Sequence, residues 1–178
     1  MTPGPLCLAD IDTPIGPLVA AGDDTHLLLF EFGYRRMYNE QLERVRKATG
    51  RDFERGESPV FAQLRRELDE YFAGERTEFE VPLSAPGTPF QMRVWDELRR
   101  IPFGSTTSYA RLAQSIGSPN AVRAVARANG DNRIAILIPC HRVIGSDGTL
   151  VGYGGGLWRK KRLLELEGRS HNLPLFEQ

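Results

Sequence analysis

Cysteine, histidine and long apolar runs are scarce in this chain of 178 residues. It has three histidines and two cysteines, Cys7 and Cys140. Two cysteines are too few for a disulfide-rich scaffold. No apolar run approaches the length of a membrane span, and the first residues lack the basic and then apolar pattern of a signal peptide. We therefore expect a cytoplasmic protein with reduced thiols, although two cysteines also allow one disulfide.

The chain also lacks net charge, because 23 basic side chains balance 23 acidic ones. Taken alone, this balance argues against binding to nucleic acid. The two halves differ, however. Residues 1–86 hold 10 Lys and Arg against 16 Asp and Glu, a net of −6, whereas residues 87–178 hold 13 against 7, a net of +6. A basic second half is what a domain that binds a polyanion needs.

Residues 84–89, Ser-Ala-Pro-Gly-Thr-Pro, form the clearest domain boundary, and the sign of the charge changes across them. The sequence therefore predicts an N-terminal domain over 1–86 and a C-terminal domain over 87–178.

The N-terminal domain is predicted to contain a small antiparallel sheet and a helix. Apolar stretches separated by turn residues read as three strands, over 6–12, 18–21 and 27–32. Residues 36–48 are expected to be helical or irregular. Apolar residues recur at helical spacing over 59–73, behind the cap residue Ser58 and before Gly74, which predicts a helix.

The C-terminal domain is predicted to be mostly helical, which gives an α+β fold overall. Helical spacing of apolar residues indicates helices over 89–101, 108–116, 119–129 and from about 157 to 167, the last closed by Gly168. The second and third surround Gly117-Ser118-Pro119 and look like a helix-turn-helix. Arg123 and Arg127 share an exposed face of the third helix, although exposed arginine is usually only solvated surface.

Residues 136–144, Ile-Leu-Ile-Pro-Cys-His-Arg-Val-Ile, are the most informative stretch of the chain. Pro139 fixes its own φ and removes a backbone donor, so Cys140 is expected where regular structure stops. A thiol becomes nucleophilic as the thiolate, which nearby cations or a positioned base favour. A buried structural cysteine at the end of a strand is the alternative that a Cys-His pair by itself favours.

The segment from Pro139 to Val143, followed by Gly-Tyr-Gly-Gly-Gly at 152–156, resembles the active-site segment of O6-alkylguanine-DNA alkyltransferases. Residues 13–18 resemble the family's N-terminal hairpin, and the likeness is strongest over 90–167. The resemblance implies a ribonuclease-H-like N-terminal domain and a DNA-binding C-terminal domain. It implies that the protein moves an alkyl group from O6-alkylguanine, and from O4-alkylthymine, in duplex DNA to its own cysteine. It further implies that each molecule acts once and that no cofactor is needed.

The resemblance also implies catalytic roles. Cys140 matches the alkyl acceptor, His141 the base that draws the thiol proton through a water, and Glu167 the carboxylate that orients this histidine. Asn132 matches the asparagine that ties the helix-turn-helix to the active-site loop. Tyr109 matches the tyrosine that donates to the guanine ring and crowds the phosphate beside the flipped nucleotide. Read without the resemblance, the last three suit a surface glutamate, a turn asparagine and a core aromatic.

The same resemblance assigns a DNA-binding surface and a substrate pocket. Arg123 matches the arginine that fills the gap left by the flipped base, and Ala121 is the small residue that lets the helix approach the minor groove. Val143 matches a residue whose carbonyl accepts from the exocyclic amine of guanine. Tyr153 and the backbone of Gly154 match the loop that closes the pocket. Gly154 stands where several relatives have a larger residue, so this loop is expected to be more flexible.

The expected partner is double-stranded alkylated DNA, with no membrane contact. We expect a monomer, and cooperative binding along DNA is left open. Some family members bind zinc in the N-terminal domain, but here Cys7 and His26 are the only Cys and His in residues 1–86. Two ligands do not complete a four-coordinate site, so we predict no structural zinc.

Three other functions compete with alkyl transfer. A non-catalytic alkyltransferase-like protein binds damaged DNA but replaces the cysteine, often by tryptophan, whereas this chain has Cys140. A thiol hydrolase or redox protein would have a water-accessible site or a Cys-x-x-Cys pair, and the pair is absent here. A helix-turn-helix transcription regulator leaves the Pro-Cys-His-Arg segment unexplained.

Overall fold

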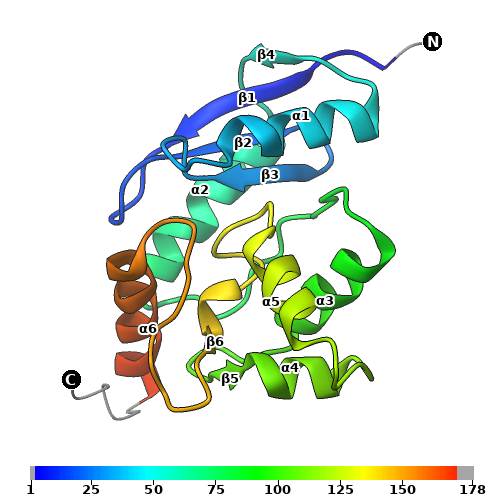
Figure 1. Cartoon of the computed structure of the whole chain (residues 1–178). Coiled ribbons are helices and arrows are strands. Elements are labelled where there is room, and N and C mark those ends of the chain that lie inside the picture. Colours follow the sequence, from blue (N-terminus) through cyan, green and yellow to red (C-terminus); the bar gives the residue numbers. More distant parts are fainter. Residues whose placement is uncertain (1–2, 172–178) are drawn as a thin grey trace. The chain divides into compact units, whose positions relative to one another are not determined.

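The computed structural model describes the backbone of residues 3–171 and the side chains of residues 3–168. The chain separates into two compact units, residues 1–86 and 87–178. The expected α+β fold is confirmed, with a small sheet in the first unit and mostly helices in the second (Figure 1). Within the described part, no helix is both long enough and apolar enough to cross a membrane.

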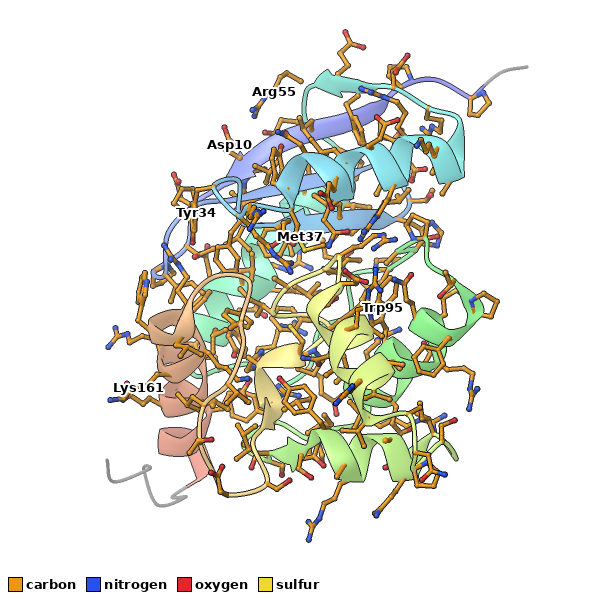
Figure 2. The ribbon with its side chains drawn as sticks, viewed as in Figure 1. Asp10, Tyr34, Met37, Arg55, Trp95 and Lys161 are labelled. Atoms are coloured by element: carbon orange, nitrogen blue, oxygen red, sulfur yellow. The ribbon has the colours of Figure 1, made fainter. Side chains whose placement is uncertain are left out.

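A four-stranded sheet in the order β3-β2-β1-β4 forms the base of the first unit. Its strands are β1 (Leu6–Ile11), β2 (Leu18–Gly22), β3 (Leu27–Glu31) and β4 (Phe53–Arg55). The three antiparallel strands expected from the sequence are confirmed. The short β4 was not expected, and it pairs in parallel with β1, so the sheet is mixed. Arg55 of β4 and Asp10 of β1 form an ion pair of 3.0 Å (Figure 2).

Two helices, α1 (Tyr38–Thr49) and α2 (Pro59–Phe72), pack on the sheet against β3 and β2, respectively. The helix predicted from Ser58 and the apolar spacing is confirmed as α2. The N–H of Phe61 donates to Ser58 Oγ over 3.4 Å at its start. Gly74 follows its end with a φ of 77°, a left-handed value that glycine adopts at little cost, so the chain leaves the helix there.

The second unit consists of short helices, two paired strands of two residues each, and long loops. Its elements are α3 (Pro89–Arg99), β5 (Thr107–Ser108), α4 (Tyr109–Ser115), α5 (Val122–Gly130), the 3-10 helix η1 (Cys140–Arg142), β6 (Val143–Ile144) and α6 (Leu157–His171). Helix α3 packs against α4 and α5, and β5 pairs in parallel with β6. Trp95 of α3, labelled in Figure 2, is 3% exposed, and its Nε1–H donates to the Ala128 carbonyl of α5 over 2.9 Å.

Three features of this unit differ from the expectation. Helix α5 begins at Val122 rather than at residue 119, because the N–H of Ala121 donates to the Ser118 carbonyl in a turn. Helix α6 does not close at Gly168 but continues through it, with Gly168 buried. The apolar run over residues 134–138 forms turns and bends, so the alternative of a cysteine at the end of a strand does not hold.

Candidate active site

Residues 131–144 are all buried, although most of them form turns rather than regular structure. Asn132 holds this segment: its Nδ2 donates to the Ile138 carbonyl over 2.8 Å, and its Oδ1 accepts from the Ile134 N–H over 3.0 Å. Ile136 has a φ of 71° and is the one non-glycine residue with a positive φ in the described part of the chain. That conformation is costly for a β-branched residue and breaks the strand that the local sequence favours.

Cys140 begins η1 directly after Pro139. Its N–H donates to the Ile138 carbonyl over 2.8 Å, and its side chain is buried, with 9% of the residue exposed. The Ile138 carbonyl also accepts from Asn132, so one asparagine fixes the backbone from which the cysteine projects. Cys7 and Cys140 are both present as thiols, and no disulfide joins them.

His141, Arg142 and Glu167 form a buried polar cluster that begins one residue after Cys140. His141 Nε2 lies 2.8 Å from Glu167 Oε1. Arg142 binds the same carboxylate twice, from Nε to Oε2 and from Nη2 to Oε1, both over 2.9 Å. Its Nη1 donates to the Ile101 carbonyl over 2.6 Å. Because the guanidinium is held on two sides, the carboxylate is fixed in position against the imidazole.

The surroundings of this cluster determine where its protons lie. Burial lowers the pKa of His141 below its ordinary value, although Glu167 opposes that change. Burial alone would raise the pKa of Glu167, but His141 and Arg142 outweigh it and hold that pKa well below its usual range. A neutral imidazole beside an ionised carboxylate carries its proton on Nε2, because the carboxylate only accepts. Nδ1 is then an acceptor, and among the described residues it has no hydrogen-bond partner.

A glycine-rich segment connects β6 to α6; residues 145–156 are called the pocket loop below. Tyr109 Oη donates to the Val151 carbonyl of this loop over 3.2 Å. Lys160 Nζ, from α6, donates to the same carbonyl over 2.9 Å and to the next one over 3.1 Å. Burial raises the pKa of Tyr109 and lowers the pKa of Lys160 to about 8, and Cys140 raises both.

The residues expected to line a pocket lie on the two segments that follow the cysteine. Val143 is fully buried in β6, which pairs with β5 just before Tyr109. Tyr153 is half-buried in the pocket loop, and Gly154 is exposed there. The first turn of α6 carries Trp158, which is 54% exposed, with the guanidinium of its neighbour Arg159 4.0 Å above its ring.

Of the residues expected to touch DNA, Ala121 and Arg123 lie at the start of α5, and Tyr109 is the first residue of α4. Helix α4 ends before Gly117, whose φ is 72°, and α5 packs against α4 after the turn. Ala121 is the N-cap residue of α5 and is half-buried. Arg123 and Arg127 are both exposed, so this face of α5 is basic.

No group of three or more His, Cys, Asp or Glu side chains that could hold a metal ion occurs within the described part of the chain. Cys7 Sγ lies 3.5 Å from the Glu57 carbonyl, and His26 Nδ1 lies 2.9 Å from Thr25 Oγ1. The absence of structural zinc stays a prediction of the sequence.

Two family models together match almost the whole chain. The model described as 6-O-methylguanine DNA methyltransferase, ribonuclease-like domain, matches residues 8–85. The model described as 6-O-methylguanine DNA methyltransferase, DNA binding domain, matches residues 89–169. The chain belongs to the 6-O-methylguanine DNA methyltransferase family.

Members of this methyltransferase family match the chain over nearly their full length. The methylated-DNA–protein-cysteine methyltransferase of Mycobacterium leprae is 48% identical over 169 residues, which cover 94% of this chain and 96% of that protein. The constitutive methylated-DNA–protein-cysteine methyltransferase of Bacillus subtilis is 44% identical, and the match covers 90% of this chain and 94% of that protein. The crystal structure of Mycobacterium tuberculosis OGT in complex with DNA has a TM-score of 0.79 and 45% identity, with 92% and 94% covered.

Sequence reasoning assigned no role to two residues of this methyltransferase-family site, Arg142 and Lys160. Arg142 was part of the motif, but nothing in the sequence indicates that its guanidinium turns back to Glu167. Lys160 did leave a signal. It lies three, four and seven residues before Leu163, Leu164 and Glu167, which are all buried on one face of α6. A charged residue on a buried helical face is a candidate for a specific polar contact.

Proposed function

We propose that this protein repairs DNA by moving the alkyl group of O6-alkylguanine to the sulfur of Cys140, once per molecule. The observation that carries the proposal is the cluster that begins one residue after Cys140, in which His141 Nε2 lies 2.8 Å from Glu167 Oε1 and Nδ1 has no hydrogen-bond partner among the described residues. Membership of the methyltransferase family and the DNA-bound structure of the relative from M. tuberculosis support the same function. O4-alkylthymine is proposed as a second substrate.

The proposed reaction is a single displacement. A bridging water passes the proton of the Cys140 thiol to Nδ1 of His141, and the thiolate attacks the alkyl carbon. A carbon–sulfur bond forms as the bond from carbon to O6 breaks, and its electron pair stays on the guanine. The guanine becomes neutral by taking up one proton, which balances the proton lost by the thiol, and we assign to Tyr109 a hydrogen bond to the ring that stabilises the departing base. The thioether has no leaving route, so each molecule reacts once.

Arg142 has a part in this scheme that the sequence did not indicate. Its two hydrogen bonds keep the Glu167 carboxylate ionised and oriented. An ionised Glu167 stabilises the imidazolium that forms when His141 takes up the proton. We therefore class Arg142 as a positioning residue, since it acts through Glu167 and not on the substrate.

Access to O6 requires that the guanine leave the base stack. We propose that α4 and α5 act as a helix-turn-helix, with α5 entering the minor groove and Ala121 allowing close approach. The exposed guanidinium of Arg123 would occupy the gap in the stack, where a planar cation stacks better than an ammonium. The flipped base would lie against Val143, Tyr153 and Gly154, and Asn132 would couple α5 to the cysteine segment. The net charge of +6 over residues 87–178 supports binding to DNA.

The deciding experiment is the intact mass of the protein after mixing with a duplex that contains one O6-methylguanine. The wild type should gain one methyl group, and so should the control variant Cys7→Ser. Cys140→Ser should gain none and still bind the duplex. If the wild type binds tightly without a change in mass, a non-catalytic damage-binding role replaces this proposal. The monomeric state, the cytoplasmic location and the lack of a cofactor stay predictions of the sequence.

A further inference from the structure

Side chains from outside the pocket loop bind three of its carbonyls: Val151, Gly152 and Gly155, the last through Arg159 Nη1 of α6 over 2.9 Å. Tyr109 Oη and Lys160 Nζ both donate to Val151, and Lys160 donates to Gly152 as well. Glycines with left-handed φ values stand at 148, 152 and 156, and backbone hydrogen bonds hold the loop toward its two ends, from Gly145 to Thr149 and from Gly156 to Tyr153. At Val151 and Gly152 the loop is therefore restrained by the three bonds from Tyr109 and Lys160.

Lys160 is an unusual residue for such a place. It is fully buried, and no carboxylate of the described residues lies within ion-pair distance of it. A buried cation without a counter-ion is costly, and lysine is rarely found so unless it has a specific polar contact. Here the contacts are the two loop carbonyls. The next residue, Lys161, points outward from α6 and its side chain is 48% exposed (Figure 2).

Under the proposed function, the Tyr109 hydroxyl also donates a hydrogen bond to the guanine ring. A phenol has one proton to donate, so Tyr109 cannot hold Val151 and the base at the same time. If Tyr109 turns to the base, Val151 retains the hydrogen bond from Lys160 over 2.9 Å, which is shorter than the 3.2 Å bond from Tyr109. The loop then stays closed over the base while the tyrosine is released.

We propose that Lys160 is the positioning residue that keeps the pocket loop closed, and that Tyr109 exchanges its hydrogen bond from Val151 to the guanine when the base enters. This inference rests on the proposed function for the guanine contact, but the loop anchor can be tested without it. Lys160 contacts the loop and not the substrate, so its removal should weaken the retention of the base more than the chemical step.

The test compares Lys160→Met with the matched control Lys161→Met. Amide hydrogen exchange is measured for residues 149–156, with the amides of α3 as an internal control for folding. In Lys160→Met the loop amides should exchange about tenfold faster or more, which is the loss expected for two hydrogen bonds from a buried cation. Lys161→Met and the α3 amides of both variants should match the wild type. Unchanged loop exchange in Lys160→Met would overturn the anchor.

Transfer kinetics with free O6-benzylguanine provide the second readout. Lys160→Met should raise the half-saturating concentration about tenfold or more and leave the limiting rate within about threefold, and Lys160→Arg should restore part of the loss. A fall in the limiting rate with an unchanged half-saturating concentration would instead mean that Lys160 acts on the chemical step at the Cys140 thiol, and would overturn the proposal. Transfer by the wild type tests the proposed function itself, so the two failures are distinguishable.

Tyr109→Phe tests whether the hydrogen bond from Tyr109 to Val151 can be given up. Because Lys160 keeps both of its bonds, the loop amides of this variant should exchange at nearly the wild-type rate, within about threefold. Loop amides that exchange as fast as in Lys160→Met would mean that Tyr109 is needed to hold the loop. The proposed change of its hydrogen-bond partner from Val151 to the guanine would then be wrong.

Discussion

At the scale of single residues, one carboxylate serves two partners with different needs. Glu167 accepts from His141 and twice from Arg142, and all three side chains are buried. A buried pair of this kind is strongly destabilised when one partner is removed, because the other charge loses its compensation. The site therefore depends on the shape of the guanidinium as well as on its charge.

Arg142→Lys separates charge from shape. Lysine keeps the positive charge but cannot form two parallel hydrogen bonds to Glu167 and a third to the Ile101 carbonyl. We expect the free energy of unfolding to fall by about 2 kcal/mol. The single-turnover rate on duplex DNA should fall about tenfold, since the carboxylate is less well placed.

Urea denaturation and quenched-flow transfer measure these two effects. Arg127→Lys, on the exposed face of α5, is the control and should change stability by less than about 0.5 kcal/mol. Equal behaviour of the two variants would show that the contacts of Arg142 to Glu167 are dispensable.

At the scale of elements, the sequence was sufficient to predict helices with periodic apolar residues. It did not predict elements that form through contacts between distant parts of the chain. The apolar spacing of α2 and the cap at Ser58 were sufficient to predict that helix, because both signals are local. The strand β4 has three residues, two of them charged, and it exists because β1 offers a free edge in parallel. No pattern in Phe53–Arg55 contains that information.

The segment over residues 134–138 shows the same limit more sharply. Four of its five residues are Ile or Leu, which favours a strand. Asn132 instead bonds to the backbone at both ends of the run, and Ile136 adopts a left-handed conformation. A side chain outside the run thus overrides the propensity within it. The identities of Cys140, His141 and Glu167 were available from the resemblance, whereas the partners of Arg142 and Lys160 required coordinates.

The helix α5 supports a prediction at this scale. Arg123→Ala should slow repair of O6-methylguanine in duplex DNA about tenfold or more, because the cost of taking the base out of the stack is no longer offset. Transfer from free O6-benzylguanine should stay within about twofold, since a free base is not stacked.

Single-turnover rates on the two substrates measure the difference. The control is Arg127→Ala, one turn further along the same exposed face, for which only a moderate loss on the duplex is expected. Equal losses on the duplex and on the free base would count against insertion of Arg123 into the stack.

At the scale of the whole molecule, the buried cluster makes stability depend on pH. The pKa of His141 is lowered by burial from its ordinary value of 6.5, so the unfolded chain binds this proton more tightly. The stability of the folded state is thus full above about pH 6.5 and decreases as the pH falls below it. The pKa of Glu167 is lowered from 4.5, so a further loss begins below about pH 4.5.

We therefore expect the free energy of unfolding to decrease between pH 6.5 and pH 5 by up to about 1.4 kcal/mol per pH unit for this histidine. Urea denaturation over this range measures it, and His141→Gln isolates the contribution because glutamine does not titrate. The decrease should be smaller in the variant than in the wild type. The same slope in both proteins would mean that another group is responsible.

The two tryptophans of the chain have opposite surroundings, so their intrinsic fluorescence can report on two different parts of the molecule. Trp95 is closed in between α3 and α5, so its emission belongs at shorter wavelength and is insensitive to dissolved quenchers. Trp158 stands exposed two residues after Gly156, where the pocket loop ends, beneath the guanidinium of Arg159. Its emission belongs at longer wavelength and is open to iodide. Rearrangement of the loop can thus be followed through Trp158 in unlabelled protein, with Trp95 as the internal reference.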